Sequence, residues 1–143
     1  MSGKTSSGRD PVQVLGRLVE AAGVTSMVSG VVAWFTVRAQ LADEKIVVPG
    51  SGRAVTGPLS AYQEADVIKQ IALRATEGKT YGELEEDHPA AAMAKDASLL
   101  RASLFTSILA FGMAGTQVAV GAVLTAIGRA LSRTAKRLPA LPA

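Results

Sequence analysis

Charged residues are missing from two long stretches of the chain and gather between and outside them. The longer stretch, residues 102–128, contains 27 uncharged residues between Arg101 and Arg129. As an α-helix it would be about 40 Å long, against a bilayer hydrocarbon core of about 30 Å. A charge at the bilayer centre costs about 2.5–3.5 kcal/mol on insertion scales, and a buried helix of a soluble bundle normally carries a polar face. The pattern therefore predicts a transmembrane helix over residues 102–128.

The second stretch, residues 21–37, is also free of charge, but its 17 residues lie at the lower end of the spanning range. Apolar residues before it lengthen the predicted span to residues 15–38, which places Arg17 and Glu20 near one interface. Trp34 marks the opposite boundary, as aromatic residues do where a helix leaves the bilayer.

A cleaved signal peptide is the alternative for this first stretch, because Lys4, Arg9 and Arg17 form a basic region before it. Cleavage would leave a protein with a single span. The stretch is longer than the apolar region of a usual signal peptide, and the sequence VRAQLA after it is a poor cleavage pattern. We therefore expect the first span to be retained.

The flanking basic residues predict the orientation of the spans. The first span has three Lys or Arg residues on each side, so it gives no preference. The second span is followed by four basic residues and no acidic one, against Lys95 and Arg101 before it. Both termini are therefore predicted to be cytoplasmic, in a multi-pass protein of the plasma (inner) membrane. The predicted segments are a cytoplasmic N-terminal tail (1–14), a transmembrane helix (15–38), an extracytoplasmic segment (39–101), a second transmembrane helix (102–128) and a basic cytoplasmic tail (129–143).

Small residues recur at intervals of seven in both spans. A period near 3.5 residues favours left-handed packing, and small side chains let two helix backbones approach closely. The pattern predicts the contact line of an antiparallel helix hairpin or of an oligomer of hairpins, although Gly and Ala are also simply common in membrane helices. The predicted helix-packing residues are Gly16, Gly23, Gly30, Ala114, Gly121 and Gly128.

The middle segment is predicted to be rich in helix. Residues 44–58 alternate short β-branched runs with a Gly/Pro turn, which predicts a small β-hairpin or an extended cover. Pro58 suits an early helix position, and Ser60 to Gln63 has capping-box spacing. A helix with Ala61, Ala65, Ile68 and Ala72 on one face should then run as far as Gly78. A second sequence with capping-box spacing, Thr80 to Glu83, precedes a long helix that should begin near Ala90 and run into the second span.

These elements predict an all-α membrane protein, a hairpin of two transmembrane helices with a helix-rich extracytoplasmic segment. The chain has only one Trp, two Tyr and three Phe with which to build a soluble core. Its basic residues are thinly spread without interleaved aromatic residues, which argues against nucleic acid as a partner.

Candidate catalytic chemistry is sparse. The chain has no Cys, which excludes thiolate metal sites and cysteine nucleophiles, and its one histidine, His88, lies in a polar turn and reads as a solvated loop residue. The two GKT strings lack the earlier glycine that a phosphate-binding loop requires. No ionisable residue lies inside either span, so there is no proton relay to indicate a pump. We therefore predict no catalytic residue, no cofactor, no metal site and no evident small-molecule substrate.

The run GPLSAYQEADVIKQIALRATEGKTYGEL and the later ASLLRASLFTSILAFGMAG resemble a family of small actinobacterial membrane proteins, often labelled aromatic ring-opening dioxygenase small subunits. The resemblance covers residues 15–131 and implies a two-span layout, without any established catalytic residue. An extradiol ring-opening site needs Fe(II), typically held by two His and one carboxylate. With a single His, this chain would at most be a non-catalytic partner of such an enzyme.

The leading hypothesis from the sequence is an accessory or structural protein of the cell envelope that acts by contact with protein or lipid. The alternatives are a subunit of an oligomeric pore or transport complex and, third, the dioxygenase partner. Expected partners are membrane lipid and either further copies of the chain or a larger membrane complex. The residues predicted to lie at the membrane interfaces are Trp34, Arg38, Arg101, Arg129, Arg133, Lys136 and Arg137.

Overall fold

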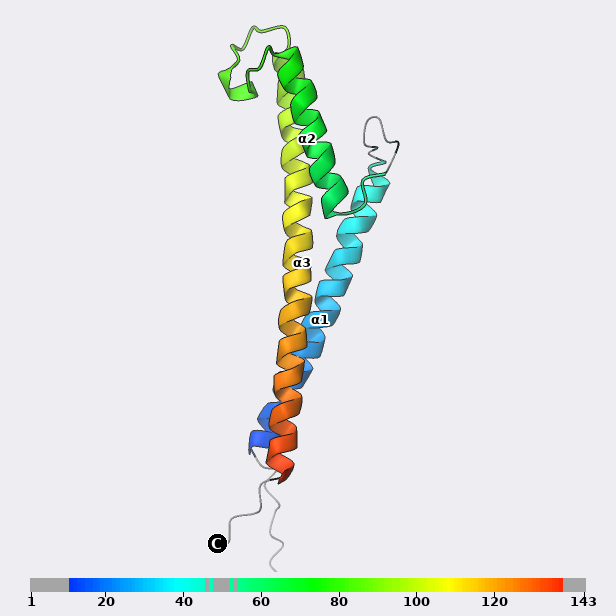
Figure 1. Ribbon diagram of the computed structural model, residues 1–143, viewed down its shortest axis with the longest axis vertical. Helices are drawn as coiled ribbons and strands as arrows, with labels where there is room; N and C mark the ends of the chain where they lie inside the picture. Colours follow the sequence, from blue (N-terminus) through cyan, green and yellow to red (C-terminus); the bar gives the residue numbers. More distant parts are fainter. Residues whose placement is uncertain (1–10, 46, 48–51, 53, 138–143) are drawn as a thin grey trace, which may run out of the picture. The chain divides into compact units, whose positions relative to one another are not determined.

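The structure, a computed structural model, describes residues 11–45, 47, 52 and 54–137 (Figure 1). Its elements are α1 (Pro11–Asp43), α2 (Pro58–Ala75), the 3-10 helix η1 (Tyr81–Glu83) and α3 (Ala91–Arg137). The prediction of an all-helical fold is confirmed, and no strand occurs among the described residues. Two helices, α1 and α3, are long and apolar enough to cross a membrane. The outer parts of the two predicted tails, residues 1–10 and 138–143, lie outside the described residues.

Both long helices extend beyond the predicted spans. α1 has 33 residues and α3 has 47, because helix formers without Gly or Pro continue α1 past residue 37 and extend α3 at both ends of its uncharged stretch. Pro11 opens α1, where its missing N–H costs no hydrogen bond. The prediction that a single helix runs from near Ala90 through the second uncharged stretch is confirmed by α3.

Hydroxyl groups within the uncharged stretch of α3 bond to the helix's own backbone. Thr106 Oγ1 donates to Ala102 O at 2.9 Å, and Ser107 Oγ donates to Ser103 O at 3.2 Å. In both cases the acceptor is the backbone carbonyl four residues earlier in the helix, so the hydroxyl donor is satisfied. This arrangement lets Ser and Thr occupy an apolar segment without an outside hydrogen-bond partner.

The chain divides into two compact units. In the first, which we call the helix-pair unit, described residues 11–32 of α1 pack antiparallel against residues 114–137 of α3. Gly16 lies beside Gly128 at one end of this pair, and Gly30 lies beside Ala114 at the other.

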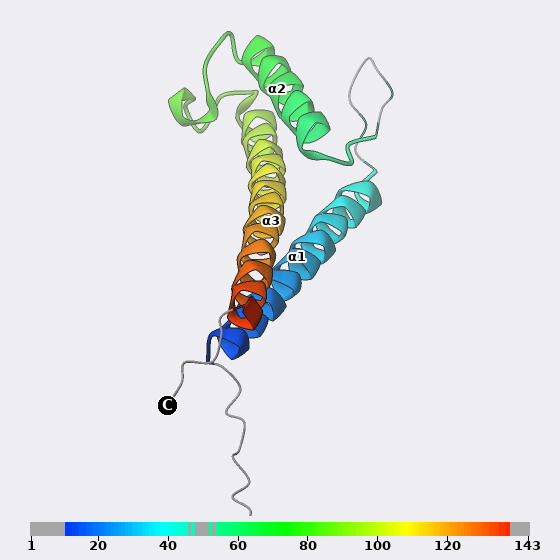
Figure 2. The same cartoon turned by 60° about the horizontal axis from the view of Figure 1, so that its bottom comes forward.

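The second unit, which we call the three-helix unit, comprises residues 33–113. Here α2 packs against the end of α1 and the beginning of α3 (Figures 1 and 2). Trp34 meets Phe111 edge to face with 4.7 Å between ring centroids. The buried core consists of Leu41, Val55, Ala61, Ala65, Leu104 and Phe111.

The predicted inner face of α2 is largely correct, and so is Pro58 as an early helix residue, but the predicted capping role of Ser60 is wrong. Ala61 and Ala65 are buried in the core, and Ile68 packs against it. The helix begins at Pro58, because proline already has the helical φ angle. Ser60 is therefore the third helical residue rather than the N-cap, and its Oγ accepts hydrogen bonds from the N–H groups of Thr56 and Gly57 at 3.1 Å each.

The end of α2 follows the predicted stop at Gly78. The helix ends at Ala75, and Gly78 adopts a φ of +89°, which favours glycine. Its N–H donates to Leu73 O at 2.7 Å, so the turn satisfies one of the last free carbonyls of the helix. Thr76 is fully buried in this turn and its hydroxyl donates to Ala72 O at 3.0 Å.

The predicted β-hairpin reduces, among the described residues, to a single antiparallel bridge between Val47 and Ala54. Residues 46, 48–51 and 53 lie outside the described residues. The apolar runs on either side of the turn are short, and a ladder of one bridge does not make a strand. Val55, by contrast, is completely buried among the helices, as an extended cover over the core requires.

Candidate functional site

The two long helices make backbone contact along three levels of the helix-pair unit. A Cβ atom added to Gly128 would lie 2.6 Å from Gly16 O, and one added to Gly121 would lie 2.5 Å from Gly23 O. At the third level, a Cβ added to Gly30 would lie 2.7 Å from Ala114 O. These distances are far below van der Waals contact, so no larger residue fits without moving the helices apart.

We call this line of contact the glycine seam. It consists of the six small residues singled out by the sequence pattern, and the structure brings all of them together in buried positions: Gly16, Gly23, Gly30, Ala114, Gly121 and Gly128. Their seven-residue spacing places successive small residues at successive contact levels, which is the geometry of left-handed helix pairs.

One ion pair beside the seam was not anticipated from the sequence. Arg129 Nε lies 2.8 Å from Glu20 Oε1, and the two side chains are 59% and 33% exposed. Glu20 follows Gly16 by four residues and precedes Gly23 by three, so the spacing does place it on the seam face. The spacing therefore predicts that Glu20 faces the other helix. It does not predict that Arg129 is its partner.

A second contact between the helices is polar. Ser26 Oγ donates to the backbone oxygen of Gln117 at 3.0 Å. A bond from a side chain to a helix carbonyl needs a close approach of the two backbones, which the glycine seam provides. Ser132, near Gly16, has a buried Oγ without a hydrogen-bond partner among the described residues.

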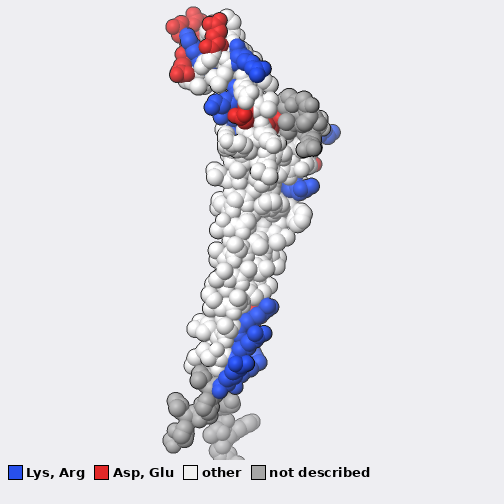
Figure 3. Space-filling model, in the orientation of Figure 1, with Lys and Arg blue, Asp and Glu red and all other residues white. Residues whose placement is uncertain are grey.

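The predicted interface residues have different surroundings. Trp34 is half-buried against Phe111, whereas Arg38 is exposed on α1. Arg101 is half-buried, and its Nε donates to Ala65 O at 3.1 Å. In the helix-pair unit, basic side chains gather at one end and the neighbouring surface is uncharged (Figure 3). The exposed basic residues of this end are Arg17, Arg129, Arg133, Lys136 and Arg137.

The single histidine has a structural contact. His88 is half-buried, and its Nδ1 accepts a hydrogen bond from the N–H of Ala90 at 3.1 Å, just before α3 begins at Ala91. The sequence interpretation of a solvated loop residue is therefore incomplete, because the ring satisfies a backbone donor at a helix start. Among the described residues, no three His, Asp or Glu side chains gather where they could hold a metal ion.

Two carboxyl groups outside the apolar stretches have shifted acidity. Burial raises the pKa of Glu64, which lies on α2 with one carboxylate oxygen that has no partner among the described residues. Hydrogen bonds from the hydroxyl and the N–H of Thr80 lower the pKa of the exposed Glu83. The second contact is the reciprocal cap predicted for this turn, here capping η1.

The site as a whole offers surfaces for packing. Its distinctive features are a backbone contact between two apolar helices, an ion pair at one end of that contact and a basic helix terminus. The chain matches no protein-family model, and no curated protein or solved structure matches it.

Proposed function

We propose that the protein is an integral membrane protein of the cell envelope that acts by contact with lipid and with other proteins, without catalysis of its own. The observation that carries this proposal is the exposure of the apolar side chains on α1 and α3. In the most apolar part of each helix, only 11% and 22% of the residues are buried. The core helix of a soluble protein would have most of this surface covered.

Individual side chains support the same proposal. In α3, Leu109 is 69% exposed and Met113 is 74% exposed, while the small residues of the seam are buried. A soluble protein rarely leaves a continuous apolar surface of this kind open to water. In a bilayer, exposed apolar surface is favourable, because membrane helices pack through small residues and turn large apolar residues toward lipid.

The proposed orientation places both termini in the cytoplasm. The basic end of the helix-pair unit then lies at the cytoplasmic face, where anionic lipid attracts Lys and Arg. The segment between the two spans, residues 39–101, lies outside the plasma membrane in this orientation and is the part of the chain available to an envelope partner.

A further contact within the membrane is proposed from Gln117. Its side-chain amide is exposed on α3 and has no hydrogen-bond partner among the described residues. Such a group in hydrocarbon is costly unless a neighbour satisfies it. A second copy of the chain or another membrane protein would supply that neighbour, which agrees with the expected assembly into an oligomer or a larger complex.

A pore subunit, the alternative, would also assemble into an oligomer, but that oligomer would conduct ions or solutes. In a pore, the Gln117 amide would line the central axis and contact water, whereas in a packed interface it would be shielded from water. Ion flux through vesicles that contain the purified protein would favour the pore. Absence of flux from a defined oligomer favours the contact role.

Cysteine accessibility in intact cells tests the proposed topology. Single Cys residues at Ser7, Glu86 and Thr134 would be probed with a membrane-impermeant thiol reagent; Glu86 is chosen because it is exposed between η1 and α3, and the wild-type chain contains no Cys. We expect labelling at position 86 alone, with the full-length mass retained. Labelling at positions 7 and 134 but not at 86 would reverse the proposed orientation. Loss of the N-terminal segment that carries the first apolar stretch, as signal-peptide cleavage would cause, would leave one span.

A further inference from the structure

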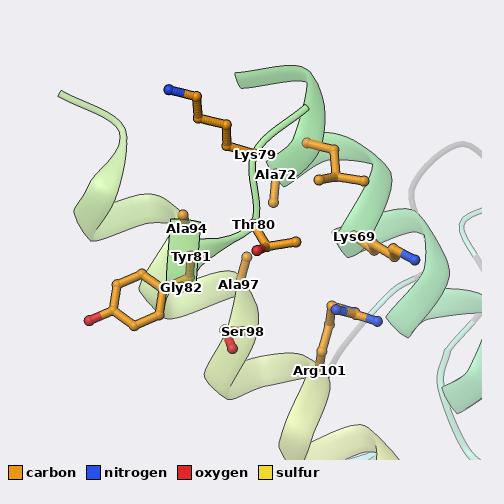
Figure 4. Close-up of a pocket in the computed structure, with 11 residues that line it drawn as sticks. Lys69, Ala72, Lys79, Thr80, Tyr81, Gly82, Ala94, Ala97, Ser98 and Arg101 are labelled. Atoms are coloured by element: carbon orange, nitrogen blue, oxygen red, sulfur yellow. The ribbon is translucent and has the colours of Figure 1, made fainter. Parts of the chain in front are cut away.

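A cavity between α2, the η1 turn and α3 carries positive charge in the three-helix unit. It has a volume of about 160 Å³ and is lined by three cations, Lys69, Lys79 and Arg101, and by no carboxylate (Figure 4). Ser98 adds a hydroxyl group to the wall, whereas the hydroxyl of Thr80 donates to Glu83 Oε2 at 2.7 Å. We call it the basic cavity. A buried water needs only about 10–15 Å³ of such space, so a phosphate group fits.

The three cations do not all point the same way. Lys69 from α2 and Arg101 from α3 reach toward the same side of the cavity, whereas Lys79 extends away from them (Figure 4). The same two residues also line a neighbouring cavity of about 230 Å³ with Tyr62, Asp66 and Phe105. Lys69 and Arg101 therefore line both cavities.

Arg101 is held in place by the protein. Its Nε donates to Ala65 O at 3.1 Å, and its guanidinium carbon lies 5.9 Å from the centre of the Phe105 ring. These contacts use one N–H of the guanidinium and leave the terminal N–H groups for another acceptor. A positioned guanidinium is well suited to a phosphate, which accepts two parallel hydrogen bonds from it.

No acidic side chain neutralises the two cations. Among the residues that the structure describes, the only ion pair within 4.0 Å joins Glu20 and Arg129, in the other unit. Asp66 lines the neighbouring cavity, where its Oδ2 accepts a hydrogen bond from Gln70 at 2.9 Å. Its charge disfavours an anion on that side, so an anion held by Lys69 and Arg101 would lie in the basic cavity.

The sequence places this charge at the level of lipid phosphates. Arg101 is the last charged residue before the 27 uncharged residues of α3, which span about 40 Å as a helix. The hydrocarbon core is about 30 Å thick and the bilayer with its headgroups is about 40–45 Å thick, so Arg101 falls in the headgroup layer. Tyr62, whose ring centroid lies 6.2 Å from that of Phe105, supplies an aromatic side chain typical of that layer.

We propose that the basic cavity binds the phosphate of an anionic phospholipid, with Lys69 and Arg101 as its two cationic contacts. The inference rests on the proposed function, because it needs the second span to lie in a bilayer. It goes further by assigning a lipid class and a binding site on the segment outside the membrane. A bound lipid would tie α2 to α3 at the membrane surface.

The test uses the full-length protein in dodecyl maltoside micelles, titrated with dioleoyl phosphatidylglycerol and followed by native mass spectrometry. We expect Lys69→Gln to weaken the apparent affinity about fivefold, the loss expected for one cation near an anionic headgroup. Lys69 is exposed and donates no hydrogen bond among the described residues, so the change should leave the fold intact. Arg74→Gln, which removes an exposed cation of α2 that lines neither cavity, should bind like the wild type.

Two results would overturn the proposal. Equal losses in Lys69→Gln and Arg74→Gln would reduce the binding to general electrostatic attraction. Displacement of the lipid by inorganic phosphate at the same concentration would make the cavity a site for free anions. Binding in micelles does not depend on orientation in the cell, so failure here with external labelling at position 86 would remove only the lipid site and not the proposed topology.

Discussion

The helix-pair unit and the three-helix unit use the same spacing of contact residues, but glycine recurs at this spacing only in the helix-pair unit. On α1, contacts with α3 in the helix-pair unit come from Gly16, Glu20, Gly23, Met27 and Gly30. In the three-helix unit, the core positions of α1 continue this alternation of three and four residues as Trp34, Val37 and Leu41. One helix thus places glycine at every second contact position in one unit and larger residues at every contact position in the other.

The size of the contact residues decides how many elements each unit packs. Where glycines meet, the backbones touch and two helices fill the contact by themselves. Where Trp34 and Phe111 meet, the large rings contribute to a core that also includes α2 and the cover residue Val55. The contribution of α2 is itself small, since Ala61 and Ala65 are its buried core residues. Periodicity alone therefore predicts a contact, and side-chain size predicts the number of partners.

The most disruptive test of this comparison is Gly121→Leu. The first side-chain atom would lie 2.5 Å from Gly23 O, so the helix-pair unit must separate, at a cost of about 3 kcal/mol or more. We expect a lower thermal midpoint in detergent and a longer, broader distance between spin labels on Leu18 and Ile127, which are exposed on the two helices.

Gly115→Leu is the matched control for that substitution. Gly115 lies on the same helix, is exposed, and has no atom within 4 Å of an added Cβ. It should leave the label distance unchanged. If both variants behave alike, the effect of Gly121→Leu is one of helix composition and the seam does not hold the pair together.

A smaller loss is expected from Phe111→Leu in the three-helix unit. The ring is 1% exposed and meets Trp34 edge to face, so the change removes some buried volume and an aromatic contact, at a cost of about 1–2 kcal/mol. Trp34 fluorescence should shift as its neighbour changes, and the thermal midpoint should fall.

Phe35→Leu provides the comparison for this loss. Phe35 is 63% exposed and forms no ring contact among the described residues. Its replacement should leave the thermal midpoint nearly unchanged. An equal fall in both variants would show that the Trp34–Phe111 contact adds nothing specific.

The two units also differ in how far the sequence predicts them. The helix-pair unit can be predicted from local patterns, because its uncharged stretches are continuous in the sequence and its glycines recur every seven residues. The three-helix unit depends on where α2 folds back against α3. Arg101 and Ala65 are joined by a hydrogen bond across 36 positions, and no periodicity indicates that pairing. The basic cavity draws residues from α2, the η1 turn and α3 and was missed for the same reason.

Within the three-helix unit, local sequence patterns predict the positions of helix caps to within a few residues. The cap at Thr80 was placed correctly because its partner Glu83 is three residues away. The spacing at Ser60 predicts an N-cap, whereas the helix begins at Pro58, because both starts fit the same local sequence. Burial of Glu64 could not be foreseen, since a charged residue on an otherwise small-residue helix face is usually solvated.

Glu64 offers the finest probe of the three-helix unit, because its effect should depend on pH. The residue is 4% exposed, and burial raises its pKa above the ordinary value of 4.5. The folded protein therefore holds the proton more tightly than the unfolded chain. Below about pH 4.5 the carboxyl is protonated in both states and costs nothing. As the pH rises through the unfolded and then the folded pKa, ionisation increasingly destabilises the fold.

Glu64→Gln removes that ionisation while it keeps the shape of the side chain. We expect the variant to be more stable than the wild type by about 1 kcal/mol at neutral pH, the scale of one unsatisfied buried polar group. The gain should shrink as the pH falls and vanish near pH 4, when the wild-type carboxyl is neutral. Thermal unfolding of both proteins in detergent from pH 4 to 8 measures it, with Glu86→Gln, at an exposed position, as the variant that should show no such trend. A constant difference across the range would mean that Glu64 is ionised equally in both states, and that the core around α2 admits water.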